Sequence, residues 1–216
     1  MEKTTFYLVR HGESLGNAKH VLLGWTDLDL SELGYAQARS TAAAMADIHF
    51  DAIYSSSLLR AYNTAVPHAE LRAMTVEGRD ELREIFLGEW ENMSVESVIE
   101  KYGEDMYFRQ WRDNFGTFTC PGGESVQGAC DRFFAEVERI AVCHPGGTVL
   151  IAAHGAVIRS FYGRASGIAP EKLGEELPFP SNASYSIVEY SDGKFSPVSF
   201  SCDSHLSEIG ITKVNW

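Results

Sequence analysis

Positive charge is scarce in this 216-residue sequence, which has 18 Lys and Arg residues against 30 Asp and Glu residues. The formal net charge of −12 argues against a chain-wide attraction to nucleic acid or to an anionic membrane surface. We therefore expect no nucleic acid partner and no membrane partner. Any anion that the protein binds must be held by a local cluster of positive side chains.

Long apolar runs and paired cysteines are also missing. No stretch approaches the roughly 18 apolar residues of a transmembrane helix, and the N-terminus lacks the pattern of a signal peptide, so we expect a cytoplasmic protein. The cysteines show neither the close pairs of a zinc site nor the density of a disulfide scaffold. We predict no metal site, and reduced thiols in or near the core at Cys120, Cys130, Cys143 and Cys202.

What the sequence does contain is enough apolar material for a large core, because 44% of its residues are hydrophobic. Residues 1–216 are predicted to form a single domain. Short apolar runs alternate with amphipathic stretches, a pattern typical of a layered α/β domain with a mostly parallel sheet. We expect a three-layer α/β/α sandwich.

The strands of this sheet are predicted at residues 5–9, 52–55, 74–77 and 148–153. Helices are predicted to begin near Ser14, Ser31, Ser57 and Gly155, and an amphipathic helix is expected over residues 124–141, where apolar residues recur every three or four positions. Near the C-terminus, YSIVEY and KFSPVSF flank SDGK, which predicts a hairpin at the sheet edge.

Residues 88–121 differ in character from the rest of the chain. They combine many charges with the aromatic residues Trp90, Tyr102, Tyr107, Phe108, Trp111, Phe115 and Phe118. We interpret this segment as a helical insertion over the C-terminal edge of the strands, serving as a lid or a specificity element. Each aromatic side chain could either belong to a satellite core or contact a substrate.

Two of the predicted strands end in polar residues that a core would reject. FYLVRHGES (residues 6–14) and VLIAAHG (residues 149–155) each finish with a histidine and a glycine, at His11 and His154. Because parallel strands end at one edge of a sheet, we expect the two histidines to meet there. Gly12 and Gly155 would let the backbone approach a ligand, and the helices that follow would offer N–H groups suited to phosphate.

A third turn of this kind follows the strand AIYSS. Ser57 is expected to cap the next helix, which places Arg60 in the first turn and within reach of the same pocket. Arg10 adjoins His11 at the end of its strand. The sequence therefore predicts three turns that converge on one anion site.

These residues carry a resemblance to a known family. FYLVRHGES, SLLRAYNTA, LREIFLGEWE and IAAHG resemble, in content and order, the motifs of the histidine phosphatase superfamily, also called the phosphoglycerate mutase-like family. With GWTDLDLSELG and PGGES, the resemblance covers nearly the whole chain. It implies that His11 is a nucleophile that forms a phosphohistidine, and that Glu84 is the proton donor. The residues that it implies around the phosphate are Arg10, Asn17, Arg60 and His154. Gly155 is predicted to bind the phosphate from its turn at the helix start.

The residue types agree with this chemistry. Arginine offers phosphate a planar, permanently charged fork of donors, and a neutral imidazole can attack in line while a carboxyl group protonates the leaving oxygen. We expect neighbouring positive charges to keep His11 neutral and a backbone carbonyl to fix its tautomer. Pattern alone does not choose Glu84 over Glu81, Glu89 or Glu91.

The reaction type needs a separate argument, because the family contains both hydrolases and mutases. The segment EIFLGEWENMS lacks the arginine-rich insertion of the mutases, and Ala156 stands where they place asparagine. We therefore predict a metal-independent and cofactor-independent phosphatase for a small phosphorylated metabolite, with Arg109 and Arg112 as specificity contacts. A phosphoglycerate mutase and a non-catalytic phosphate-binding module are the alternatives. The substrate and the oligomeric state stay open, and the other histidines are predicted to be structural or solvated.

Overall fold

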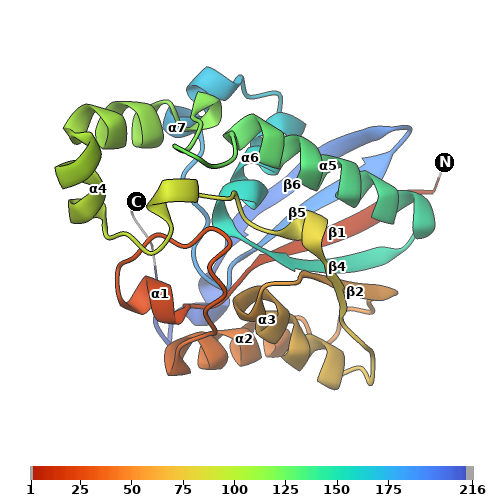
Figure 1. Ribbon diagram of the computed structural model, residues 1–216. Helices are drawn as coiled ribbons and strands as arrows, with labels where there is room; N and C mark the ends of the chain where they lie inside the picture. Colours follow the sequence, from red (N-terminus) through yellow and green to blue (C-terminus); the bar gives the residue numbers. More distant parts are fainter. Residues whose placement is uncertain (1, 213–216) are drawn as a thin grey trace.

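The computed structural model describes residues 2–212, which form a six-stranded, mostly parallel sheet between two helical layers (Figure 1). The strand order is β3-β2-β4-β1-β5-β6, with β5 and β6 antiparallel to their neighbours. The predicted α/β sandwich is therefore confirmed. The strands are β1 (Thr4–Arg10), β2 (Ala52–Ser56), β3 (Glu77–Arg79), β4 (Thr148–Ala153), β5 (Tyr185–Ser191) and β6 (Lys194–Cys202).

The helices α5 and α6 cover one face of the sheet, and α2 and α3 cover the other. Side chains of β1 alternate between the two resulting cores, since Phe6 and Leu8 enter the core under α5 and α6 while Val9 enters the other. The α-helices are α1 (Leu15–Ala18), α2 (Glu32–Ala44), α3 (Leu59–Glu70), α4 (Val95–Tyr102), α5 (Val126–Cys143), α6 (Gly155–Ala165) and α7 (Leu173–Glu176). None of the described helices is long and apolar enough to cross a membrane.

The edge hairpin is formed by β5 and β6 as predicted. Asp192 and Gly193 both have positive φ angles, 53° and 74°, which is the backbone conformation of the tight turn that suits twisted strands. Because β5 runs antiparallel to β1, the loop before β5 lies at the edge where β1 ends. This placement brings Phe179 to the cavity described below, and Pro180 and Asn182 into hydrogen bonds with residues that line it.

Two predicted element boundaries are wrong. The strand expected at residues 74–77 pairs only over β3 (Glu77–Arg79), because Met74 and Val76 pack against the core instead of joining the ladder. The helix expected from Ser57 begins at Leu59, and Ser57 donates its hydroxyl to Asp80 instead of capping the helix. The helix predicted from about Ser14 does begin there, with Ser14 as its N-cap, and it has four residues.

The segment at residues 88–121 contains α4 and a π-helical turn, η3 (Met106–Asp113), which extend the core of the α5 side beyond the sheet (Figure 1). Trp90, Trp111 and Phe118 are buried and in mutual aromatic contact, with ring centroids 5.2–5.8 Å apart. The satellite core is therefore real, and it is continuous with the main one.

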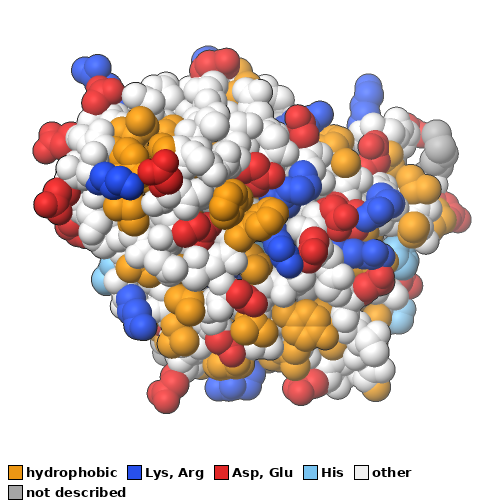
Figure 2. All heavy atoms as spheres, in the orientation of Figure 1, with side chains coloured by type: hydrophobic (Ala, Val, Ile, Leu, Met, Phe, Trp, Pro, Cys, Tyr) orange, Lys and Arg blue, Asp and Glu red, His pale blue; other side chains and the backbone are white. Residues whose placement is uncertain are grey.

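The cysteines follow the prediction only in part. Cys120 and Cys130 are buried, and burial raises the pKa of their thiols to about 12 and about 11. Cys143 is exposed at the end of α5, and Cys202 is half-buried. The prediction of a core position is thus wrong for Cys143. Figure 2 shows acidic and basic side chains interspersed over the face of the molecule in view.

Candidate active site

The two predicted histidines meet at the C-terminal edge of the sheet. β1 and β4 are parallel neighbours in a register that pairs Arg10 with Ala153, so the next residues, His11 and His154, leave the sheet side by side. Their ring centroids lie 5.3 Å apart, and the rings are inclined at 58°. Both residues are buried.

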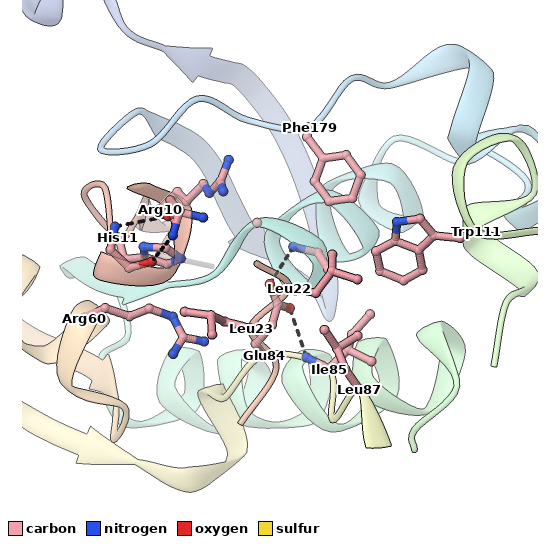
Figure 3. A pocket seen from close by; sticks show the side chains of 14 residues that line it. Arg10, His11, Leu22, Leu23, Arg60, Glu84, Ile85, Leu87, Trp111 and Phe179 are labelled. Carbon is pink, nitrogen blue, oxygen red and sulfur yellow. Dashed lines mark hydrogen bonds between the residues drawn. The ribbon is translucent and has the colours of Figure 1, made fainter. Parts of the chain in front are cut away.

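A cavity of about 480 Å³, including space open to solvent, lies at this edge. Its polar end is formed by Arg10, His11, Ser14, Asn17 and Arg60, and Glu84 stands beside it (Figure 3). The cavity also contacts Gly155 and Ala156 at the start of α6. Its remaining side, which we call the apolar wall, consists of Leu22, Leu23, Ile85, Leu87, Trp111 and Phe179.

His11 is held in one tautomer by the backbone. Its Nδ1 lies 2.7 Å from the carbonyl oxygen of Gly12, which can only accept, so Nδ1 carries the proton and Nε2 keeps a free lone pair. Burial lowers the pKa of His11 well below its usual range, and the charges of Arg60 and Arg10 lower it further. The ring is therefore neutral at pH 7 and can act as a nucleophile through Nε2.

In His154 it is Nε2, and not Nδ1 as in His11, that has a hydrogen-bond partner. Its Nε2 lies 2.8 Å from the hydroxyl of Ser56, which accepts a hydrogen bond from the backbone N–H of Leu58 and can donate its own proton to the ring. In the tautomer in which Ser56 donates, Nδ1 carries the ring proton. Nδ1 is buried without a partner among residues 2–212. Burial, followed by the charge of Arg60, lowers the pKa of His154 well below its usual range.

Two arginines supply the positive charge that the net composition lacks. Arg10 donates to the carbonyl oxygen of Pro180, and Arg60 donates to those of Gly24 and Thr26 at 2.7 and 2.9 Å. In the described part of the chain, the buried Nε of each arginine has no acceptor. Burial lowers the pKa of both guanidinium groups to about 10, so both stay charged at pH 7.

Glu84 is buried beside the polar end with its carboxylate against the start of α6. Its oxygens accept from the backbone N–H groups of Ala156 and Ile85, each at 3.0 Å (Figure 3). They also accept from the N–H of Val157 at 3.2 Å. These bonds and the two arginines favour the carboxylate, but burial outweighs them and raises the pKa of Glu84. The raised pKa lets this carboxyl group hold its proton to a higher pH than an exposed glutamate does.

The helix starts contribute differently from the prediction. Glu84 occupies two N–H groups of α6, and Asp27 accepts from the N–H of Leu59 at the start of α3, at 2.8 Å. The glycines serve packing: a Cβ on Gly12 would lie 2.5 Å from the carbonyl oxygen of Gly34, and one on Gly155 would lie 3.1 Å from Nε of Arg10. The side chains of Arg10 and Arg60, more than helix dipoles, make the polar end cationic.

Asn17 lines the cavity, and a residue that the sequence did not single out orients it. Asn182 is fully buried, and its Nδ2 donates to Oδ1 of Asn17 at 3.1 Å and to the carbonyl oxygen of His11 at 3.0 Å. Oδ1 of Asn17 also accepts from the N–H of Ser14, so its Nδ2 is the amide atom left for the cavity. A signal for Asn182 was available in the sequence. If the predicted edge hairpin is paired with β1, the loop before β5, which contains SNAS (residues 181–184), must lie at this edge of the sheet.

The predicted contacts from Arg109 and Arg112 are wrong for this structure. Their side chains are 78% and 52% exposed and bind Asp105 and Asp113 instead of lining the cavity. Their neighbour Trp111 is the residue of η3 that reaches the cavity, because the opposite side of this helical turn faces the protein. In residues 2–212, no group of three His, Cys, Asp or Glu side chains is placed to hold a metal ion.

The fold and this pair of histidines define a class of phosphoryl-transfer protein. The model of the "Histidine phosphatase superfamily (branch 1)" matches residues 6–203, and the chain belongs to that superfamily. The predicted family resemblance is confirmed.

Individual relatives include enzymes of both reaction types. The chain is 35% identical over 203 residues to "Phosphoserine phosphatase 1" of Hydrogenobacter thermophilus, covering 94% of each sequence. It is 30% identical to "2,3-bisphosphoglycerate-dependent phosphoglycerate mutase 2" of Gloeobacter violaceus, covering 88% of each. Among solved structures, Bacillus stearothermophilus YhfR superposes with a TM-score of 0.86 at 28% identity, over 94% of this chain and 100% of that one.

Proposed function

We propose that the protein is a phosphatase that hydrolyses a small phosphomonoester through a phosphohistidine at His11, with no metal. The observation that carries this proposal is a set of unpaired donors. Nε of Arg10, Nε of Arg60 and Nδ1 of His154 are buried without an acceptor in residues 2–212. Unpaired buried donors are costly, and the oxygens of a phosphoryl group would satisfy them.

In the first step, Nε2 of His11 attacks the phosphorus atom and the bond to the leaving oxygen breaks. Glu84 gives its proton to that oxygen, which leaves as an alcohol or phenol. The arginines hold the equatorial oxygens, and Nδ1–H of His154 donates to the transferring group. The hydrogen bond from Nδ1 of His11 to Gly12 stabilises the positive charge that develops on the ring.

In the second step, Glu84 acts as a carboxylate and takes a proton from water. The water oxygen bonds to phosphorus, the bond between phosphorus and Nε2 breaks, and inorganic phosphate is released. The raised pKa of Glu84 suits both roles, because the group must be protonated in one step and ionised in the next. Asn182 holds the loop that carries His11 in place for both steps, through its hydrogen bonds to the carbonyl oxygen of His11 and to Asn17.

Hydrolysis is favoured over mutase activity by the surroundings of the transferred group. A mutase must hold the second anionic group of its substrate. The residues that face the polar end are those of the apolar wall, which contains no cationic side chain to bind such a group. The relative with 35% identity is named as a phosphatase, and the mutase cited above is less similar at 30%. Ala156 lines the cavity at the position where the mutases place asparagine.

Turnover of p-nitrophenyl phosphate in the presence of a chelator tests this function. We expect activity to survive chelation and to fall by at least about 10³ in His11→Ala. His49→Ala is the matched control, because that side chain is 87% exposed and remote from the cavity, and it should keep full activity.

Three other results would overturn the proposal. Phosphate binding without turnover would identify a binding module. Loss of activity on chelation would require a metal. Interconversion of 2- and 3-phosphoglycerate, primed with bisphosphoglycerate and faster than hydrolysis, would identify a mutase.

A further inference from the structure

The cavity divides into two ends of opposite chemistry. Figure 3 shows Arg10, His11 and Arg60 gathered on one side, Glu84 and Leu23 between the two ends, and Trp111 and Phe179 on the far side with Leu22, Ile85 and Leu87 of the apolar wall. A phosphoryl group on His11 would direct its ester group past Glu84 toward that wall. The composition of the wall therefore bears on which esters the site accepts.

The geometry points to a substrate whose leaving group is apolar and uncharged, an aryl or alkyl phosphate, and not one with a second anionic group such as phosphoserine. This inference rests on the proposed function and narrows it. Burying an apolar group against the wall gains about 25 cal/mol for each Å² removed from water. A carboxylate in the same place would lose its hydration without gaining a counter-charge.

The cations at the cavity are already committed to its polar end. Arg10 and Arg60 are both held there by backbone carbonyl groups and both face the phosphoryl position. No lysine, arginine or histidine contributes to the apolar wall. The nearest acid to the leaving group is Glu84, whose carboxylate form would repel a second anion.

One further cation lies close by, but the wall covers it. Arg159 is 3% exposed, and its guanidinium carbon lies 4.4 Å from the ring centroid of Phe179 and 4.7 Å from that of Phe115. Its Nε and Nη2 donate to the carbonyl oxygens of Leu177 and Leu173. The Phe179 ring therefore separates this charge from the cavity, and removing the ring would uncover it.

The wall has one polar atom, the indole nitrogen of Trp111. It is buried and lacks an acceptor among residues 2–212, and Figure 3 shows it on the edge of the indole ring nearer to Phe179. A neutral donor of this kind can bind an ether, carbonyl or hydroxyl oxygen of a leaving group without selecting a charge. An aryl or alkyl group with one such oxygen matches the wall best.

Binding of two non-hydrolysable phosphonates tests the inference without depending on the chemistry of the leaving group. Benzylphosphonate and phosphonoacetate share a phosphonomethyl group and differ in carrying a phenyl ring or a carboxylate. We expect calorimetry to give at least about tenfold tighter binding of benzylphosphonate, the size of effect that burial of one ring supplies. Equal affinity, or tighter binding of phosphonoacetate, would overturn the inference. Weak binding of both beside tight binding of inorganic phosphate would also overturn it.

Variants locate the preference. Phe179→Ala should reduce the preference for benzylphosphonate to less than about threefold, because it removes apolar area and uncovers Arg159. Leu23→Arg should favour phosphonoacetate by placing a cation on the wall. Phe108→Ala, an aromatic change on η3 outside the cavity, should leave the preference unchanged. A preference that survives Phe179→Ala intact would show that this wall does not produce it.

Failure of the inference and failure of the proposed function give different results. Hydrolysis of p-nitrophenyl phosphate without a phosphonate preference would reject only the inference about the leaving group. A strong preference for benzylphosphonate without turnover would reject the proposed phosphatase activity and leave the inference about the apolar wall standing.

Discussion

The two ends of the cavity differ in how the chain builds them. The polar side chains at one end lie at the end of a strand of the central sheet or within a few residues after it, and hydrogen bonds to the backbone hold them, as His11 is held by Gly12 and Arg60 by Gly24 and Thr26. The apolar wall comes from separate connecting segments that meet by packing, including η3 and the loop before β5. In our proposal, residues at the ends of the strands therefore carry out the reaction, while residues on the connecting segments determine which ester binds.

Apart from the nucleophile, the largest effect is expected at Glu84, which stands between the two ends. Glu84→Gln should lower kcat for an alkyl phosphate by about 10² to 10⁴, the usual contribution of a positioned acid, while inorganic phosphate still binds. The first step with p-nitrophenyl phosphate should suffer less, because its leaving group needs little protonation. Stopped-flow and steady-state rates on both esters measure this.

Glu81→Gln is the matched control, since Glu81 is exposed and does not line the cavity. If its rates fall as far as those of Glu84→Gln, or if Glu84→Gln changes them by less than a few-fold, another carboxylate is the donor.

A smaller effect is expected at Asn182, which supports the polar end from behind. Asn182→Ala removes the hydrogen bonds to the carbonyl oxygen of His11 and to Oδ1 of Asn17. Losing buried bonds costs about 1–3 kcal/mol, so kcat/KM should fall about 10- to 100-fold, with weaker binding of inorganic phosphate.

The control is Ser184→Ala, which removes a buried hydroxyl bond to Ser181 in the same loop. It should lower stability and leave kcat/KM of the folded enzyme near the wild-type value. Equal losses of activity in both variants would mean that Asn182 only stabilises the fold.

The smallest effect concerns a buried histidine outside the cavity. His68 on α3 is fully buried, neither ring nitrogen has a partner among residues 2–212, and burial lowers its pKa to about 3 from 6.5. Between these values the unfolded chain binds the proton and the folded protein does not, so stability falls as the pH drops through that range. The slope is about 1.4 kcal/mol per pH unit for each such group.

His68→Leu should therefore reduce the loss of stability between pH 6.5 and pH 5, as measured by urea unfolding, without changing turnover. His49→Gln, at an exposed position, should keep the wild-type slope. An unchanged slope in His68→Leu would show that the histidines at the polar end dominate acid destabilisation.

The contrast between the two ends also explains what could be predicted from the sequence. The polar end was predictable because it depends on local patterns: an apolar run followed by a histidine gives both the strand and the side chain that ends it, and parallel pairing sets His11 beside His154. Glu84 needed the family resemblance, because four glutamates share its neighbourhood. The placements of Asn182 and Phe179 depend on the hairpin packing beside β1.

The predictions that were wrong, for the arginines of η3 and for the cap of α3, failed because contacts between distant segments decide these features. Alternation and aromatic content in residues 88–121 indicate burial, but they do not say which side of η3 faces the protein, so Trp111 lines the cavity and Arg112 does not. The capping of α3 depends on Asp27, which is distant in sequence and accepts from Leu59. Contacts between separate segments override local signals in each case.

The central claim is that the phosphoryl group is transferred from the ester to Nε2 of His11. Radiolabelled p-nitrophenyl phosphate mixed with Glu84→Gln, followed by an alkaline quench and peptide mapping, tests it most directly, because loss of the base should let the intermediate accumulate. The account predicts one equivalent of label, alkali-stable, on the peptide that contains His11, together with an equal burst of p-nitrophenol. Label on His154 or on another residue, or turnover with no label, would contradict it.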